Sequence, residues 1–305
     1  MVSGMSERSL DFLVVGAPKC GTTAVAEFIG RHPDVAMSLP KEPHFFDAYY
    51  QSDTSEYISA IFPREAPERL FGEATPSYLM VPWVASRVAQ HYPMAKIIVC
   101  LRNPVERAFS SWWMLYSRGL ERLKFEDAIT AEFAQGEVLD REDAADVWRQ
   151  QIDAIASGSE LPVRTYLEAG HYAKHLGRWL EFFSRDQVHV IFSSEFHTAR
   201  DQALAKIWEK LSVEPWYPDS GEKRKVNQAF GGKALFVLRS AKSLGLMRSR
   251  RFVPEAYREP LKALLSKMGS KPTLDARMRT ALIDHFRESN TQLEKLLAVD
   301  LGHWN

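Results

Sequence analysis

The stretch Phe12-Leu-Val-Val-Gly-Ala-Pro-Lys-Cys-Gly-Thr-Thr23 carries the pattern that decides the fold of this chain. Its apolar run, Phe12–Val15, ends at Gly16 and predicts a buried strand that leads into a glycine-bounded turn. A helix is predicted from about Gly21 to Arg31. The N–H groups at the start of a helix point outward, and the helix dipole favours negative charge there. The stretch therefore predicts a strand, a loop and a helix that together bind an anion.

The side chains of this loop suit a phosphate or a sulfate. Gly16 and Gly21 let the backbone approach a ligand closely. Lys19 adds a mobile cation, while Thr22 and Thr23 add hydroxyl donors. The spacing is similar to the nucleotide P-loop, but the lysine lies inside the loop and not directly after the second glycine, and no strand ends in an aspartate suited to magnesium. A P-loop kinase or NTPase, and a plain turn with a surface lysine, stay open as alternatives.

Further apolar runs and helical patterns indicate an α/β fold. Ala95–Leu101 and Gln187–Phe192 predict strands of the kind that is covered on both faces of a parallel sheet, and Val35–Met37 predicts a short one. Helices are predicted at Pro104–Ser117, Asp127–Gly158, Tyr172–Phe183, Thr198–Leu211 and Arg277–Leu297. Strands that alternate with helices predict three layers, a central parallel sheet with helices on both faces. We expect one domain over residues 1–305, with residues 1–10 as a disordered tail.

Composition limits the possible partners. Lys plus Arg equals Asp plus Glu, at 39 each, so no overall field favours nucleic acid or an anionic membrane. Cys20 and Cys100 do not make a disulfide framework, and the polar N-terminus has no apolar signal region. The longest apolar runs are strand-length, which is too short to span a membrane. We expect a cytoplasmic protein without nucleic-acid or membrane partners, and the sequence does not indicate an oligomeric state.

Two motifs resemble the sulfotransferases that use 3′-phosphoadenosine 5′-phosphosulfate. Pro18-Lys-Cys-Gly-Thr-Thr23 matches the 5′-phosphosulfate loop of that family. Val99-Cys-Leu-Arg-Asn-Pro-Val-Glu-Arg-Ala-Phe-Ser-Ser-Trp112 matches its second element, a strand that leads into Arg-Asn-Pro and a helix with a serine. The resemblance implies that Arg102 and Ser110 hold the 3′-phosphate. It implies that the 5′-phosphosulfate is bound by Pro18, Lys19, Cys20, Gly21, Thr22 and Thr23.

Other segments extend the resemblance over most of the chain. They are Gly170-His-Tyr-Ala173, Ser194-Glu-Phe196 and Asp300-Leu-Gly-His-Trp304. Lys41-Glu-Pro-His-Phe-Phe-Asp47 makes the chain most similar to glycan-type and bacterial members, such as heparan sulfate sulfotransferases. The family has a P-loop-like fold, needs no metal and closes a late basic loop over the 3′-phosphate. That loop implies the same contact for Lys223, Arg224 and Lys225.

The resemblance also implies the chemistry. A sulfuryl group passes by in-line displacement to a hydroxyl or amine of a small-molecule or glycan acceptor, and adenosine 3′,5′-bisphosphate is the product. Lys19 is assigned to the bridging oxygen and the leaving phosphate. Glu42 is the first choice for the general base. His44 is the second choice, and an ordinary histidine pKa of about 6.5 suits that task. The expected acceptor contacts are Glu42, His44, Phe46, Thr75 and Tyr78.

Several readings stay open at this point. Many glycan sulfotransferases have a lysine where this chain has Ala74, which weakens the case for an anionic polysaccharide acceptor. A member that binds nucleotide without catalysis fits the same motifs. Cys20 is either a reactive thiol with a lowered pKa or an inert loop cysteine. His171 and His175 indicate a helix face and not a metal site, because no partner motif accompanies them.

Overall fold

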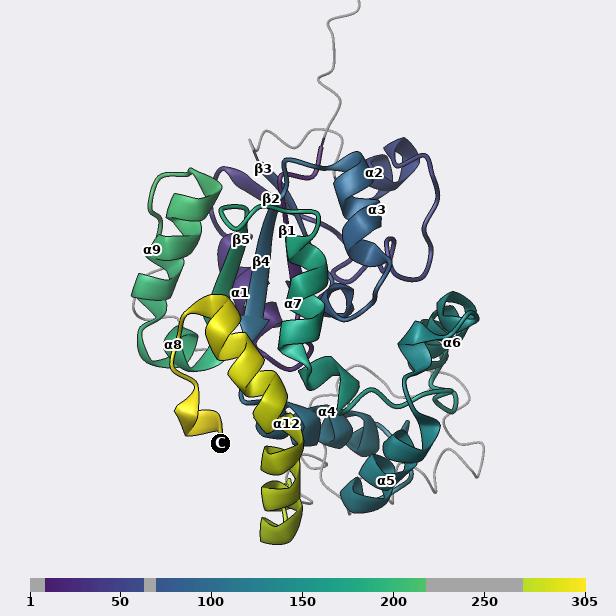
Figure 1. Ribbon diagram of the computed structural model, residues 1–305. Helices are drawn as coiled ribbons and strands as arrows, with labels where there is room; N and C mark the ends of the chain where they lie inside the picture. The colour runs from purple at the N-terminus through teal and green to yellow at the C-terminus, as the bar shows by residue number, and fades with distance from the viewer. Residues whose placement is uncertain (1–8, 63–69, 218–270) are drawn as a thin grey trace, which may run out of the picture.

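The computed structural model describes residues 9–62, 70–217 and 271–305, and a five-stranded parallel sheet forms its centre (Figure 1). The strands are β1 (Phe12–Gly16), β2 (Val35–Met37), β3 (Leu70–Ala74), β4 (Lys96–Leu101) and β5 (Val188–Phe192). Their order across the sheet is β2-β3-β1-β4-β5. The central strand β1 is therefore paired with β3 on one side and with β4 on the other.

Helices connect and cover these strands. The α-helices are α1 (Thr22–Ile29), α2 (Ser55–Ile61), α3 (Val84–His91), α4 (Pro104–Ser117), α5 (Phe125–Gln135), α6 (Ala144–Ser157), α7 (Tyr172–Leu180), α8 (Ser193–Thr198), α9 (Arg200–Leu211) and α12 (Ala276–Leu297). The short 3-10 helices are η1 (Pro76–Leu79), η2 (Val138–Asp140), η3 (Glu168–Gly170) and η5 (Gly302–Trp304).

Both faces of the sheet are covered, as the sequence predicts. On one face Phe28 of α1 packs against Phe196 of α8, with ring centroids 5.7 Å apart, and His32 packs against Trp208 of α9 at 4.9 Å. On the other face α7 packs against α3 and α12 (Figure 1). All five residues of β1 are buried, which is typical of a strand covered on both sides. The predicted three-layer α/β fold is confirmed.

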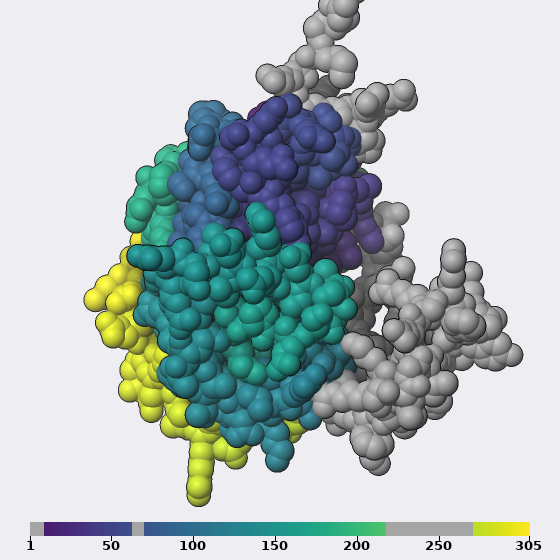
Figure 2. Space-filling view, turned by 90° about the vertical axis from the view of Figure 1, so that its right-hand side faces the viewer, coloured from purple at the N-terminus to yellow at the C-terminus, as the bar shows by residue number. Residues whose placement is uncertain are grey.

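A second apolar cluster forms where α4, α5 and α12 meet. Val105 and Phe109 of α4 pack there with Phe125 of α5 and with Leu282 and Phe286 of α12. In Figure 2 the segment from α4 to α7, coloured blue to teal, occupies the lower part of the face shown, below the purple N-terminal residues. The cluster places the first turn of α4, which follows β4 directly, against the C-terminal helix.

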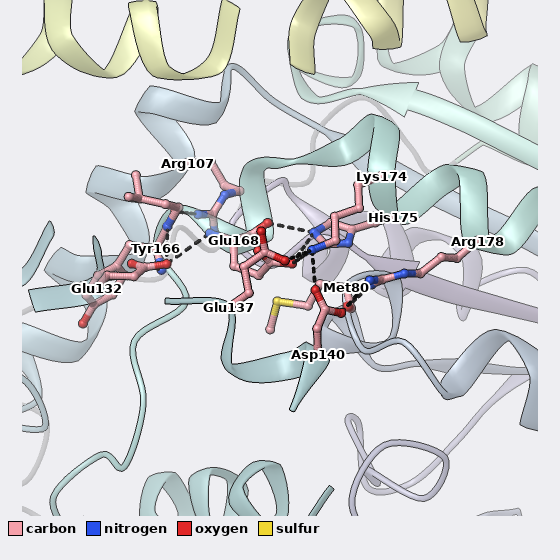
Figure 3. Close-up of polar contacts among 11 residues, drawn as sticks. Met80, Arg107, Glu132, Glu137, Asp140, Tyr166, Glu168, Lys174, His175 and Arg178 are labelled. Carbon is pink, nitrogen blue, oxygen red and sulfur yellow. Dashed lines mark hydrogen bonds and ion pairs between the residues drawn. The ribbon is translucent and has the colours of Figure 1, made fainter. Parts of the chain in front are cut away.

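A polar network fixes the start of α7 (Figure 3). Lys174 Nζ donates hydrogen bonds of 2.9–3.2 Å to carboxylates of Glu137, Asp140 and Glu168. An exposed ion pair contributes only about 0–1 kcal/mol, so the network matters for orientation more than for stability. It ties α7 to η2 and η3 and thereby fixes the position of Tyr172, the first residue of α7.

Some local predictions were wrong. The sequence predicts no strand at Leu70–Ala74, because Gly72 and the buried Glu73 interrupt what would otherwise be an apolar run. The single helix predicted over 127–158 is two helices, and Gly136, at φ 70°, ends the first of them. Leu10 is buried in the main core, so it does not belong to the disordered tail predicted over residues 1–10. One domain over residues 1–305 stays a prediction.

Gly72 tests how closely β3 packs on β1. The Phe12 ring covers its backbone, and a Cβ at this position would overlap the ring. We expect Gly72→Ala to lower the free energy of unfolding by about 1–3 kcal/mol, the usual cost of overpacking. Gly177, inside α7, has open space around it, so Gly177→Ala is the matched control and should raise that free energy by about 0.5–1 kcal/mol. Urea denaturation measures both; a Gly72→Ala protein as stable as the wild type would contradict the packing.

Candidate active site

The predicted anion loop lies at the carboxyl end of β1, beside the carboxyl end of β4. Ala17 N donates to Cys100 O at 2.7 Å, which joins the start of the loop to β4. Gly21 precedes α1 at φ 94°, a left-handed conformation that glycine adopts without strain. Thr22 then begins the helix. The strand, loop and helix that the sequence predicts are therefore formed, with the loop at the edge where parallel strands end.

Lys19 occupies the middle of this loop, at φ 71°. Its Nζ lies 3.4 Å from Met114 Sδ of α4. Burial lowers the pKa of this ammonium, nearby cations lower it further, and the negative charge of Glu42 opposes them. The cations are Arg118, Arg102 and Lys271. Lys19 is thus a half-buried cation with further positive charge around it and one carboxylate within electrostatic reach.

The second motif meets the loop from β4. Asn103 caps α4, because its Oδ1 accepts hydrogen bonds from Val105 N at 3.0 Å and from Glu106 N at 3.3 Å. Ser110 lies one helical turn before Met114, so the two share a face of α4. The contact between Met114 and Lys19 therefore places Ser110 one turn away from the lysine, along the same face.

Tyr172 holds the two motifs together. Its hydroxyl donates to Arg102 O at 2.8 Å and lies 3.6 Å from Cys20 Sγ. Both Tyr172 and Cys20 are almost fully buried. Burial raises the pKa of the Cys20 thiol, although Arg107 and Tyr172 act in the opposite direction. Burial and the raised pKa favour the inert loop cysteine over a reactive thiolate at Cys20.

A small cavity of about 10 Å³ lies on the β5 side of the loop. Its wall includes Cys20 and Gly21 of the loop, Cys100 of β4, and Ser193 and Phe196 of α8. A cavity of this size has room for about one water molecule, so it is too small for a ring.

The segment Lys41–Asp47 lies on the opposite side of Lys19. Glu42 N donates to Ala74 O at 3.2 Å, and the Glu42 side chain, which is 41% exposed, pairs with Lys41. Glu42 and His44 both have positive φ, at 60° and 56°. Such backbone costs about 1–3 kcal/mol per residue and persists only where its surroundings enforce it. Hydrogen bonds to β3 and contacts of the following residues supply that constraint.

A buried carboxylate that the sequence analysis did not assign orients His44. Asp47 Oδ2 lies 3.0 Å from His44 Nδ1 and also accepts from Ser77 Oγ at 2.7 Å and from Trp148 Nε1 at 3.0 Å. Burial alone would lower the pKa of His44. The hydrogen bond and charge of Asp47, helped by Glu42 and Glu73, outweigh burial and raise that pKa. The contact with Asp47 therefore favours the protonated ring of His44, which can donate a hydrogen bond.

Glu73 is a second carboxyl group that the sequence did not reveal. It is fully buried at the end of β3, and it accepts hydrogen bonds from the Tyr57 hydroxyl and, at 2.5 Å, from Thr75 Oγ1. Burial raises the pKa of Glu73 to about 7, although those hydrogen bonds act to lower it. Its charge also acts on His44.

The structure buries three side chains that the sequence predicts as acceptor contacts. Phe46, Thr75 and Tyr78 are each at most 1% exposed. Tyr78 Oη accepts a hydrogen bond from Phe46 N at 3.2 Å, and Thr75 donates to Glu73. These side chains support the segment Lys41–Asp47 from beneath and do not offer a surface to an acceptor.

The structure adds one basic residue to the predicted donor side, and three predicted donor residues are not described. Lys223, Arg224 and Lys225 lie outside the described residues. Lys271 belongs to no motif that the sequence singled out. Burial lowers the pKa of Lys271, and the charge of nearby Arg102 lowers it further. Its ammonium also stands 4.5 Å from the centroid of the Phe109 ring.

The described residues contain neither a group of metal ligands nor a membrane-spanning helix. Within residues 9–62, 70–217 and 271–305, no three His, Cys, Asp or Glu side chains group as metal ligands. His175 is buried, and its Nε2 lies 2.7 Å from Glu168 O. The helices of the same ranges include none that is long and apolar enough to cross a membrane.

Comparison with known proteins identifies the family. A sequence model of the sulfotransferase domain matches residues 9–212. The chain belongs to the sulfotransferase domain family. The predicted resemblance is therefore confirmed, and the matched range contains the anion loop, the Arg-Asn-Pro element and the segment Lys41–Asp47 of this sulfotransferase domain.

Relatives and a solved structure agree with that membership. Human heparan sulfate glucosamine 3-O-sulfotransferase 6 is 33% identical over 206 residues, which cover 67% of this chain and 52% of that protein. Bifunctional heparan sulfate N-deacetylase/N-sulfotransferase 1 of Caenorhabditis briggsae is 29% identical over 219 residues, 70% of this chain and 24% of that protein. The chain thus spans a quarter to a half of these relatives. A sulfotransferase structure from Alicyclobacillus acidocaldarius matches with TM-score 0.66 and 25% identity, over 97% of this chain and 99% of that one.

The pair of His44 and Asp47 predicts a pH dependence. We expect His44 to titrate above about 6.5, its ordinary value, and to titrate lower in Asp47→Asn, because burial is then no longer outweighed. The pair stabilises the folded sulfotransferase domain fully below the unfolded pKa, and this stability is lost as pH rises through the folded pKa. NMR titration of the His44 ring in both proteins measures the first effect.

Urea denaturation between pH 5.5 and 9 measures the second effect. The comparison protein is His44→Asn, chosen because asparagine tolerates the positive φ at this position. The stability difference between wild type and variant should shrink as pH rises. A His44 that titrates below its ordinary value, or a stability difference that grows with pH, would contradict the pairing.

Proposed function

We propose that this domain transfers the sulfuryl group of 3′-phosphoadenosine 5′-phosphosulfate to a hydroxyl or amine of a small-molecule or glycan acceptor. The observation that carries the proposal is the position of Lys19. Its ammonium lies against α4, among the charges of Arg102 and Lys271, and within electrostatic reach of Glu42. One lysine thus links a basic, anion-binding side with a side that offers a carboxylate.

The described residues fit such a donor. Lys19, Arg102 and Lys271 place several positive charges along one side of α4, in a protein whose overall net charge is zero. We assign the 5′-phosphosulfate to the loop Pro18–Thr23 and the 3′-phosphate to Arg102 and Ser110. The bound donor supplies the sulfuryl group and a phosphate leaving group.

The residues of this chain divide the remaining work. Lys19 stabilises the negative charge that develops on the leaving phosphate as the old S–O bond breaks. Glu42 accepts the proton of the acceptor hydroxyl or amine as the new bond to sulfur forms. Protonated His44, held by Asp47, donates a hydrogen bond toward the sulfuryl oxygens or the acceptor. Positioning and electrostatics supply most of the rate, as in phosphoryl transfer.

The names of the relatives support a glycan acceptor. One is named as a heparan sulfate glucosamine 3-O-sulfotransferase and another as a heparan sulfate N-deacetylase/N-sulfotransferase, so a hydroxyl and an amine are both represented. Ala74, where many glycan sulfotransferases have a lysine, limits how far the acceptor class follows from them. The acceptor itself and a cytoplasmic location stay predictions.

Nucleotide titration separates the proposed donor from that of a P-loop kinase. We expect adenosine 3′,5′-bisphosphate to bind in the presence of EDTA, because the site supplies cations for both phosphates without a metal. ATP, which lacks a 3′-phosphate, should bind more weakly with or without magnesium. Isothermal calorimetry measures both affinities. Magnesium-dependent ATP binding tighter than that of the bisphosphate would overturn the proposal in favour of a kinase or NTPase.

Lys19 should matter more for turnover than for binding. Replacing Lys19 by alanine should lower kcat by about 10²–10³-fold, the usual effect of removing one group that stabilises transition-state charge. Affinity for adenosine 3′,5′-bisphosphate should fall much less, since Arg102 and the loop backbone remain. Sulfate transfer from labelled donor to a library of hydroxyl and amine compounds gives the rate. An active Lys19→Ala enzyme would remove the lysine from the mechanism.

Glu42 is the proposed base. We expect Glu42→Gln to lower kcat by about 10²–10⁴-fold at saturating donor, with the donor KM unchanged, because only proton removal from the acceptor is affected. Glu56→Gln, an exposed carboxylate of α2, is the matched control and should leave both constants unchanged. The same transfer assay serves for both. Should Glu42→Gln keep its rate, the base is another group.

A further inference from the structure

Two arginines from distant parts of the chain share one carboxylate at the start of α4. Arg279 Nη2 lies 2.6 Å from Glu106 Oε1, whereas Arg102 Nη2 lies 3.7 Å from Glu106 Oε2. The first separation is that of a close ion pair, and the second is too long for any hydrogen bond. Glu106 is therefore held firmly by Arg279 and only loosely by Arg102.

The charges around Glu106 do not balance. Lys271 lies near these three side chains. Burial and the charges of Arg102 and Arg279 lower the pKa of Lys271, whereas the charge of Glu106 raises it. Three basic side chains thus surround one carboxylate, which leaves an excess of two positive charges. A phosphate monoester dianion would neutralise that excess.

Packing fixes the place of Arg279. It belongs to the first turn of α12, where the Asp275 side chain caps the helix by accepting from Arg277 N at 2.9 Å. Further along α12, the fully buried Phe286 ring packs closely on Gly170. A Cβ on Gly170 would lie only 2.7 Å from that ring and 3.2 Å from Pro104. α12 crosses α4 closely here, as Figure 1 shows. Arg279 is therefore delivered to Glu106 by a rigid contact between two helices.

We propose that Arg279 positions Arg102 for the 3′-phosphate of the donor by holding Glu106, which makes the first turn of α12 part of the donor site. The proposal rests on the proposed function, since it concerns that donor. Without Arg279, Glu106 is free to turn and pair bidentately with Arg102, in the planar geometry that arginine favours with carboxylates. A phosphate would then have to displace an internal partner before it could bind.

The test compares two nucleotides on one variant. Arg279→Ala should weaken binding of adenosine 3′,5′-bisphosphate about tenfold, which corresponds to about 1.4 kcal/mol. Binding of adenosine 5′-monophosphate, which lacks the 3′-phosphate, should be unchanged. In the transfer assay the donor KM should rise while kcat stays the same. A variant that lost affinity for both nucleotides equally would show a merely structural role and overturn the proposal.

The route through Glu106 has its own test. Glu106→Gln should bind adenosine 3′,5′-bisphosphate at least as tightly as the wild type, because the competing charge is gone. In that background Arg279→Ala should change the affinity less than about twofold, since no carboxylate is left to release. If Arg279→Ala costs the same in both backgrounds, Arg279 contacts the phosphate directly and the positioning role is wrong.

A matched control uses the same helix. Arg287 forms an ion pair with Asp284 on the exposed side of α12, so Arg287→Ala removes an arginine and an ion pair without touching α4. It should bind both nucleotides as the wild type does. A wild-type protein that does not bind adenosine 3′,5′-bisphosphate would overturn the proposed function, and the inference with it. Normal binding by both the wild type and Arg279→Ala would overturn the inference alone.

Discussion

The parallel pairing of β1 with β4 is the constraint on which the site depends. Parallel neighbours end at the same edge of a sheet, so the loop after β1 and the Arg-Asn-Pro element after β4 leave side by side. The bond from Ala17 N to Cys100 O continues this pairing beyond β1. Tyr172 then joins the two elements from below, through Arg102 O and Cys20 Sγ. Two segments some 80 residues apart thereby become one surface on which a ligand with two anionic ends fits.

Charge is divided unevenly across that surface, although the chain as a whole is neutral. The side formed by α4 and α12 carries Arg102, Lys271 and Arg279 around the single carboxylate of Glu106. The side formed by Lys41–Asp47 carries carboxyl groups, and these raise the pKa of His44. Lys19 stands between the two sides. A cationic side suits a donor with two phosphates, and an acidic side suits removal of a proton from an acceptor.

The acidic side is held by buried polar groups beneath it. Glu42 and His44 keep unfavourable positive φ values because β3 and η1 fix the segment around them. Asp47 is buried and forms hydrogen bonds with Ser77, Trp148 and His44. A half-buried ring such as that of His44 can be oriented in this way only if its partner is itself immobile. This explains why Thr75 and Tyr78, which resemble acceptor contacts in the sequence, are buried supports in the fold.

The sequence by itself determined the parts whose signals are local. The apolar runs at Phe12–Val15 and Ala95–Leu101, the glycines around Lys19 and the Arg-Asn-Pro element predicted the strands, the loop and the helix starts, because strand burial and helix capping depend on neighbouring residues. The local pattern failed at β3, where Gly72 accommodates the Phe12 ring of another strand and Glu73 is a buried carboxyl group.

Only the tertiary structure decided which side chains meet. The partners of Asp47 include Trp148, and those of Glu106 include Arg279, each more than 100 residues away. No periodicity or spacing encodes such contacts, since they depend on how helices cross. The anion loop was therefore evident from its own residues. The position of Glu106 between Arg102 and Arg279 followed only from the packing of α12 on α4. The two arginines can share that carboxylate only because these helices meet.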